Sequence, residues 1–172
     1  MRVYQTNEIK NIALLGSAGS GKTTLAESML FEAGVIKRRG SVENKNTVSD
    51  YFPVELEYGY SVFPTVFHVE WNNKKLNIID CPGSDDFVGG AITSLNVTDE
   101  AVILINGQYG PEVGTQNFFR YTEKLNKPVI FLTSLIVTSV ISMLSFRPCG
   151  IFTVRSVFKY SIHYKQEPDL ML

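Results

Sequence analysis

The amino-acid sequence predicts an α/β fold in which helices cover both faces of a doubly wound, mainly parallel sheet. Apolar runs at residues 8–15, 101–105 and 129–132 have the length of buried strands, and segments with helical spacing separate them. Two further strand-like segments, 61–71 and 75–79, are joined only by turn residues. The order is strand and helix, then a hairpin, then two helix–strand units, which is typical of a sheet wound in both directions.

The first strand ends at a glycine-rich loop, and a helix follows the loop. Residues 8–15 become apolar toward their end and stop at Gly16. After the loop, four apolar residues fall on one helical face: Leu25, Met29, Leu30 and Ala33. Gly34 stands where a helix stop is expected.

The loop itself reads Gly-Ser-Ala-Gly-Ser-Gly-Lys-Thr and fits G-x-x-x-x-G-K-[ST], the phosphate-binding loop (P-loop) of nucleoside triphosphatases. Gly16 and Gly21 let the backbone curl so that N–H groups point at phosphates. Lys22 supplies a charge for the β and γ phosphates, and the Thr23 hydroxyl can ligate Mg²⁺. We therefore expect a P-loop NTPase whose nucleotide contacts Gly16, Ser17, Ala18, Gly19, Ser20, Gly21, Lys22, Thr23 and Thr24.

The hairpin delivers a second motif to the same edge of the sheet. Alternation within 61–71 sets Phe63, Phe67, Val69 and Trp71 on one face, with Thr65 among them, and the strand 75–79 ends at Asp80-Cys81-Pro82-Gly83. Ligands of open α/β sheets collect at the carboxyl ends of the strands. Asp80 can hold Mg²⁺ through water there, and the Gly83 N–H can contact a γ-phosphate, which is the D-x-x-G switch of GTPases.

The remaining elements complete the alternation. The apolar run 101–105 predicts a central parallel strand, and 107–114 reads as a loop. Phe118, Tyr121 and Leu125 have helical spacing, and Pro128 leads into a buried strand at 129–132.

Composition restricts the remaining choices. The 172 residues allow one domain with a core, and a net charge of −1 gives no basic surface for DNA. Two cysteines, Cys81 and Cys149, make no disulfide framework and suit a reducing cytoplasm. The N-terminus carries no apolar signal segment. We expect a cytoplasmic monomer without a DNA or membrane partner.

Residues 7–132 resemble the first part of the GTP-binding domain of a translational GTPase of the elongation factor G type, and in particular its divergent, elongation factor G-like branch. The stretches that carry the resemblance are GSAGSGKTTLAESML, TVSDYFPVELEYGYS, LNIIDCPGSDDF and VILINGQYGPEVGTQNFFRYTEKLNKPVIFL. The resemblance implies GTP or GDP with Mg²⁺, hydrolysis of GTP to GDP and phosphate, further domains, and the ribosome as partner. It also implies that residues 34–61 are switch I, a segment ordered by the γ-phosphate and Mg²⁺.

Two departures from the family pattern bear on catalysis. Where the family has Arg-Gly-Ile-Thr in switch I, this chain has Tyr58-Gly59-Tyr60-Ser61, which keeps a hydroxyl for Mg²⁺ at Ser61 but loses the Arg. The family has a water-placing His directly after D-x-x-G, and this chain has Ser84. Lys22 and Ser84 are thus the candidate catalytic residues, and the Ser is expected to weaken hydrolysis more than binding.

A third departure follows Leu132. The family continues into Asn-[Lys/Gln]-x-Asp, whose Asp reads guanine, whereas this chain has Thr133-Ser134-Leu135-Ile136. Residues 133–142 can be encoded as ACC AGC TTG ATA GTG ACA AGT GTG ATT TCG, which from the third nucleotide reads Gln-Leu-Asp-Ser-Asp-Lys-Cys-Asp. The hypothesis is a small deletion that shifted the frame, so that 1–132 is a partial GTP-binding domain, 133–172 is a non-family tail, and the fold is incomplete on its C-terminal side. The coding DNA beyond codon 132 tests it.

The tail also contains the end of an 18-residue run, 129–146, without charge. That length suits a membrane-spanning helix. Its first four residues are better explained as a strand of the sheet, and it is rich in Ser and Thr.

Four functions remain open from the sequence. The leading one is a GTP-hydrolysing domain of a translation factor. The second is a switch module that binds nucleotide with little hydrolysis, which Ser84 favours. The third is an inactive fragment, which the missing guanine motif favours, and an ATPase outside translation is a weaker fourth.

Overall fold

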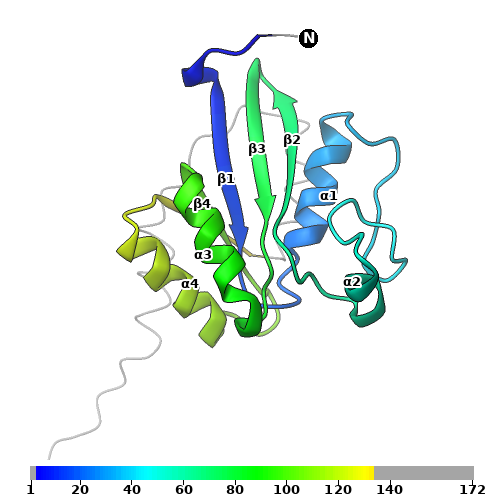
Figure 1. Cartoon of the computed structure of the whole chain (residues 1–172), viewed down its shortest axis with the longest axis vertical. Helices are drawn as coiled ribbons and strands as arrows, with labels where there is room; N and C mark the ends of the chain where they lie inside the picture. The colour runs from blue at the N-terminus through cyan, green and yellow to red at the C-terminus, as the bar shows by residue number, and fades with distance from the viewer. Residues whose placement is uncertain (1–2, 134–172) are drawn as a thin grey trace, which may run out of the picture.

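The computed structural model describes residues 3–133, which form one layered α/β unit (Figure 1). Its elements in chain order are η1 (Thr6–Glu8), β1 (Ile9–Leu15), α1 (Lys22–Glu32), α2 (Pro53–Tyr58), β2 (Thr65–Trp71), β3 (Lys74–Asp80), η2 (Asp85–Phe87), α3 (Val88–Val97), β4 (Glu100–Ile105), α4 (Val113–Lys124) and β5 (Val129–Thr133). The predictions on 134–172 lie outside the described residues. They are the shifted frame, the non-family tail and most of the uncharged run.

The five strands form one sheet in the order β2-β3-β1-β4-β5. β1 pairs in parallel with β3 and with β4, β4 pairs in parallel with β5, and β2 runs antiparallel, against β3. The chain leaves β1, builds the hairpin on one side of it, and then crosses to β4 on the other side. The doubly wound, mainly parallel sheet is therefore confirmed, and its strand order reverses at β1, where such sheets bind ligands.

Two apolar layers enclose the sheet, with α1 on one face and α3 and α4 on the other (Figure 1). Successive strand residues point to opposite faces, so in β1 Leu14 packs with Leu25 and Leu30 of α1. Ala13 and Leu15 pack in the opposite layer, whose helical members include Ala91, Leu95 and Phe118. The predicted apolar face of α1 is confirmed, and Gly34 follows the helix with φ +72°.

Several predicted boundaries were wrong by a few residues. β2 begins only at Thr65, so Phe63 lies before the strand, where it is 47% exposed and its ring lies 4.9 Å from that of Phe52. Trp71, at the open end of the hairpin, is 42% exposed, so of the expected apolar face Val69 is the buried member. α4 starts at Val113, inside the expected loop. β5 is half-buried and not buried, because it lies at the edge of the described sheet.

Helix α2 was not predicted from the sequence, and it lies in the connecting segment (residues 33–64, between α1 and β2). The signals for α2 are Pro53 in its first turn and Gly59 directly after it, with φ +73°. Among the described residues, no helix has both the length and the apolar character that crossing a bilayer requires.

Candidate nucleotide-binding site

The loop between β1 and α1 has the curled backbone that its glycines predict. Gly16, Gly19 and Gly21 have φ values of +138°, +73° and +94°, a region that side chains disfavour. A Cβ at Gly16 would lie 2.8 Å from Oγ of Ser20 and closer still to the carbonyl oxygen of Leu104. The loop can therefore close tightly over the end of the sheet only with glycine at this position.

Lys22 holds the loop from within. Its side chain is buried, and Nζ donates hydrogen bonds to the carbonyl oxygens of Gly16 at 2.9 Å and Ser17 at 3.0 Å. Burial lowers the pKa of the ammonium, and the nearby Asp80 carboxylate opposes this shift most strongly. The charged ammonium of Lys22 lies against the loop, where phosphate oxygens can replace these two carbonyl oxygens as its hydrogen-bond acceptors.

Thr23 and Asp80 meet where α1 begins and β3 ends. Thr23 Oγ1 donates a 2.8 Å hydrogen bond to Oδ2 of Asp80. The other oxygen of Asp80, Oδ1, is buried and makes no hydrogen bond of ordinary geometry among the described residues, although the Ser49 hydroxyl, also unpartnered, lies near enough to lower the pKa of Asp80. Burial raises the pKa of Asp80 to about 6, against the opposing effects of Lys22 and Thr23. An unpartnered carboxylate oxygen in a buried position is unusual and fits a ligand site.

Gly83 brings the D-x-x-G turn against the loop. A Cβ built on Gly83 would lie 2.5 Å from Lys22 Nζ and 2.7 Å from the backbone nitrogen of Ala18. The Gly83 backbone therefore adjoins the groups expected to hold phosphate.

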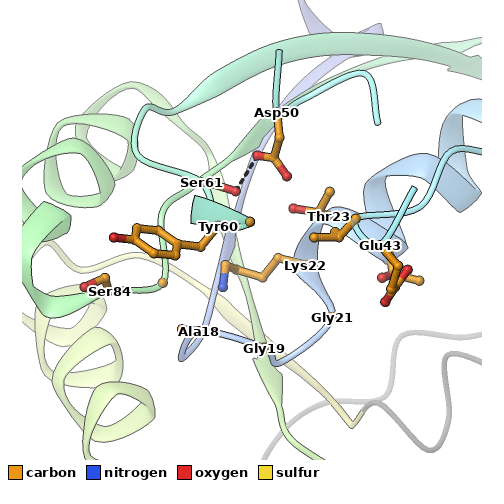
Figure 2. Close-up of a pocket in the computed structure, with 14 residues that line it drawn as sticks. Ala18, Gly19, Gly21, Lys22, Thr23, Glu43, Asp50, Tyr60, Ser61 and Ser84 are labelled. Atoms are coloured by element: carbon orange, nitrogen blue, oxygen red, sulfur yellow. Dashed lines mark hydrogen bonds between the residues drawn. The ribbon is translucent and has the colours of Figure 1, made fainter. Parts of the chain in front are cut away.

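The connecting segment contributes the opposite wall through Asp50 and Ser61. Ser61 Oγ donates a 2.7 Å hydrogen bond to Oδ1 of Asp50 (Figure 2). Asp50 is 6% exposed, and its pKa is raised mainly by burial, while the hydrogen bond from Ser61 acts in the opposite direction.

These parts surround a cavity of about 230 Å³. Its lining residues are Ala18, Gly19, Gly21, Lys22, Thr23, Thr24, Val42, Glu43, Asp50, Gly59, Tyr60, Ser61, Gly83 and Ser84. Tyr60 and Ser84 lie at one side of this cavity, and Thr23 and Glu43 lie at the other (Figure 2).

The structure thus brings the predicted site residues to one edge of the sheet. Gly16, Ser17 and Ser20 belong to the loop but do not line the cavity, and the hydroxyls of Ser17 and Ser20 are buried without a hydrogen-bond partner in residues 3–133. Asp80 lies behind Thr23. Asp50 was not predicted from the sequence, since nothing in its local pattern indicates that it returns to Ser61 across α2. The individual roles assigned to these residues stay predictions.

The donor set suits magnesium. Residues 3–133 hold no cluster of three or more His, Cys, Asp or Glu side chains with metal-site geometry. Instead, hydroxyls of Thr23 and Ser61 adjoin carboxylates of Asp80 and Asp50, one of which has an unpartnered oxygen. Mg²⁺ prefers such oxygen ligands and completes its shell with phosphate and water.

A P-loop after the first strand, with a D-x-x-G turn against it at the point where the sheet reverses, defines a nucleoside-triphosphate-binding domain. The model of the family described as "Elongation factor Tu GTP binding domain" matches residues 7–134, and the chain belongs to this family.

Curated relatives agree with this family. The chain is 37% identical over 126 residues to "Ribosome-releasing factor 2, mitochondrial" of Candida dubliniensis, covering 73% of this chain and 16% of that protein. It is 36% identical over 129 residues to "Tetracycline resistance protein TetM from transposon Tn1545" of Enterococcus faecalis, covering 75% of this chain and 20% of that protein. The chain therefore spans a fifth or less of the length of these two relatives.

Solved structures agree as well. A crystal structure of a protein from Thermus thermophilus superposes with a TM-score of 0.70 at 32% identity, over 80% of this chain and 22% of that one. The bacterial selenocysteine-specific elongation factor EF-Sec, at 18% identity and a TM-score of 0.59 over 78% of this chain and 22% of that one, shares the fold. The resemblance to elongation factor G-like GTP-binding domains is confirmed.

Proposed function

We propose that this chain binds a guanine nucleotide together with Mg²⁺, as the GTP-binding domain of an elongation factor G-like translation factor. The observation that carries the proposal is the cavity lined by the P-loop, Thr23, Ser61 and Gly83, with the unpartnered oxygen of Asp80 behind it. Three separate parts of the sequence meet at that cavity: the P-loop, the connecting segment and the D-x-x-G motif. Membership of the GTP-binding family supports guanine as the base.

Each residue has a role that its contacts support. Lys22 exchanges the carbonyl oxygens of Gly16 and Ser17 for β- and γ-phosphate oxygens. Thr23 and Ser61 contribute hydroxyls to Mg²⁺, and Asp80 supports the metal through water. Bound Mg²⁺ neutralises developing phosphate charge. The Gly83 N–H senses the γ-phosphate, close to Lys22.

Hydrolysis of GTP to GDP and phosphate is the reaction that this arrangement serves. The second candidate, a binding switch with little hydrolysis, is favoured by Ser84, which lines the cavity where the family has a water-placing His. The Ser84 hydroxyl is 3.5 Å from Oδ2 of Asp86, a weak contact that leaves it available. Both candidates are consistent with GTP hydrolysis that is slow, or that becomes fast only when a partner is bound.

Wider roles rest on relatives that are much longer than this chain. Names such as "Ribosome-releasing factor 2, mitochondrial" support the ribosome as partner and translation as process. A monomer without DNA or membrane partners, and a cytoplasmic location, stay predictions. So does the division into a partial GTP-binding domain at 1–132 and a non-family tail at 133–172.

Calorimetric titration of the whole chain with GTP and with ATP, each with Mg²⁺ and with EDTA, tests the proposal. We expect Mg²⁺-dependent binding of GTP, with modest preference over ATP because the guanine-reading motif was not found in the sequence. Absence of binding to both nucleotides would support the inactive fragment, and preference for ATP would support the ATPase. Tight, guanine-selective binding would show that other groups read the base.

A further inference from the structure

We infer that Glu27 and Glu55 are positioning residues that hold the connecting segment so that Asp50 and Ser61 face the metal side of the site. Neither glutamate lines the cavity. Both are 1% exposed, and both accept hydrogen bonds from backbone N–H groups of the connecting segment. The inference rests on the proposed function in one respect, that the site takes a nucleotide with Mg²⁺.

Glu27 fixes the first half of the segment to α1. Its Oε2 accepts from the Gly40 N–H at 2.8 Å, and its Oε1 accepts from the Val48 N–H at 2.5 Å. Glu27 lies four residues after Thr23 on the same helix, so both side chains share one helical face. The Val48 contact lies two residues before Asp50, and Glu27 therefore ties Asp50 to the helix that carries Thr23.

Glu55 fixes the second half. From α2, its Oε1 accepts from the N–H groups of Val62 at 2.9 Å and Phe63 at 3.1 Å, and its Oε2 accepts from Phe52 at 3.3 Å. Val62 directly follows Ser61. One carboxylate thus ties α2 to the backbone between Ser61 and β2, directly after the Ser61 hydroxyl that donates to Asp50.

Together the two carboxylates bracket the Asp50–Ser61 hydrogen bond. One holds the chain just before Asp50, and the other holds it just after Ser61. A buried carboxylate is costly unless its oxygens are satisfied, and the buried N–H groups need an acceptor in turn. Breaking one of these hydrogen bonds therefore leaves both the carboxylate oxygen and the backbone N–H group without a partner. This cost favours one arrangement of the connecting segment over others.

Glutamine variants with matched controls test this. In Glu27→Gln one acceptor becomes an amide donor that faces an N–H group, since both carboxylate oxygens are used. In Glu55→Gln the amide oxygen can still accept from Val62 and Phe63, and the amide nitrogen replaces only the longer, 3.3 Å contact with the Phe52 N–H. We therefore expect a milder effect. Glu32→Gln on α1 and Glu57→Gln on α2 change exposed glutamates on the same helices and serve as controls.

The first readout is amide hydrogen exchange of the ligand-free chain. We expect Glu27→Gln to speed exchange at Gly40 and Val48 by about tenfold to a hundredfold, the range for a lost charge-assisted hydrogen bond. Exchange in β4 stays unchanged, which shows that the sheet is folded. Wild-type exchange rates at Gly40 and Val48 in Glu27→Gln, with β4 intact, would overturn the inference.

The second readout is the ratio of GTP affinity with Mg²⁺ to that with EDTA. We expect this ratio to fall at least about threefold in Glu27→Gln, less in Glu55→Gln, and to stay at the wild-type value in Glu32→Gln and Glu57→Gln. If the wild-type chain shows no Mg²⁺ stimulation, the proposed function itself fails. If Mg²⁺ raises the GTP affinity of the wild type and raises that of Glu27→Gln and Glu55→Gln by the same factor, the positioning role alone is wrong.

Discussion

Thr23 Oγ1 and Asp80 Oδ2 lie 2.8 Å apart, although 57 positions separate the two residues in the chain. The hydrogen bond joins the first turn of α1 to the last residue of β3. Helix α1 directly follows the P-loop, and the D-x-x-G turn begins at the end of β3. Parallel pairing of β1 with β3 already brings the phosphate-binding and switch motifs side by side, and this hydrogen bond joins their side chains. The pair therefore places a hydroxyl of the P-loop helix directly against the carboxylate of the D-x-x-G motif.

Replacing Thr23 by Val keeps the shape of the side chain and removes the hydroxyl. We expect Mg²⁺-dependent GTP binding to weaken by about tenfold or more, because a metal ligand and a hydrogen bond to Asp80 are both lost. Binding in EDTA should change little. Thr93→Val, an exposed threonine on α3, is the matched control. Equal loss of affinity with and without Mg²⁺ would show that Thr23 acts on the loop and not on a metal.

Replacing Gly83 by Ala introduces a Cβ into a space that is already filled. The backbone nitrogen of Ala18 would lie 2.7 Å from it, so the turn and the P-loop must separate. We expect GTP affinity to fall by about tenfold or more, measured by titration calorimetry. Gly89→Ala in the first turn of α3 is the control, since a Cβ there would meet no atom within 4 Å beyond its chain neighbours and its own helix, and it should leave GTP affinity unchanged. Unchanged affinity in Gly83→Ala would mean that the turn does not touch bound nucleotide.

The sequence was sufficient for those parts of the fold that local patterns encode. The apolar faces of β1 and α1 and the glycine spacing of the P-loop are periodic or rigidly spaced signals, and the structure has them as expected. The delivery of Asp80 and Gly83 to the site followed from their place at the carboxyl end of a predicted strand, where ligands of open α/β sheets bind.

The connecting segment could not be predicted in the same way. Glu27 holds the backbone just before Asp50 and Glu55 holds it just after Ser61, and those contacts join residues up to 21 positions apart. No periodicity marks a buried glutamate whose partners are backbone N–H groups. The half-buried state of β5 was missed for a related reason, since burial depends on what lies beyond an edge strand and not on the strand itself.

The pKa of Asp80 predicts how stability of the ligand-free protein changes with pH. Its folded-state pKa of about 6 exceeds the ordinary value of 3.8, so the folded protein binds the proton more tightly than the unfolded chain. The stabilisation is complete below about pH 4 and is lost as pH rises through about 6. The raised pKa corresponds to roughly 3 kcal/mol, at about 1.36 kcal/mol for each pH unit.

Urea unfolding of wild type and Asp80→Asn from pH 4 to pH 7 measures this contribution. The free energy of unfolding of the wild type should fall relative to that of Asp80→Asn, whose side chain does not titrate. Asp50, with its pKa also raised, acts in the same direction in both proteins. A difference between the two proteins that is constant across this range would show that Asp80 titrates normally.

Ser84→His tests whether the cavity lacks only a water-placing group. Ser84 lines the cavity beside Gly83 and on the other side from Thr23 (Figure 2), so we expect an imidazole at position 84 to face the space proposed for the γ-phosphate. We expect the single-turnover rate of GTP hydrolysis to rise by about a hundredfold, the lower end of what a positioned acid–base group contributes. GTP affinity should stay within about twofold, and Ser84→Ala should leave both quantities near the wild-type values. If Ser84→His binds GTP but hydrolyses it no faster, slow turnover has another cause, and the missing Arg at Tyr58 becomes the next position to restore.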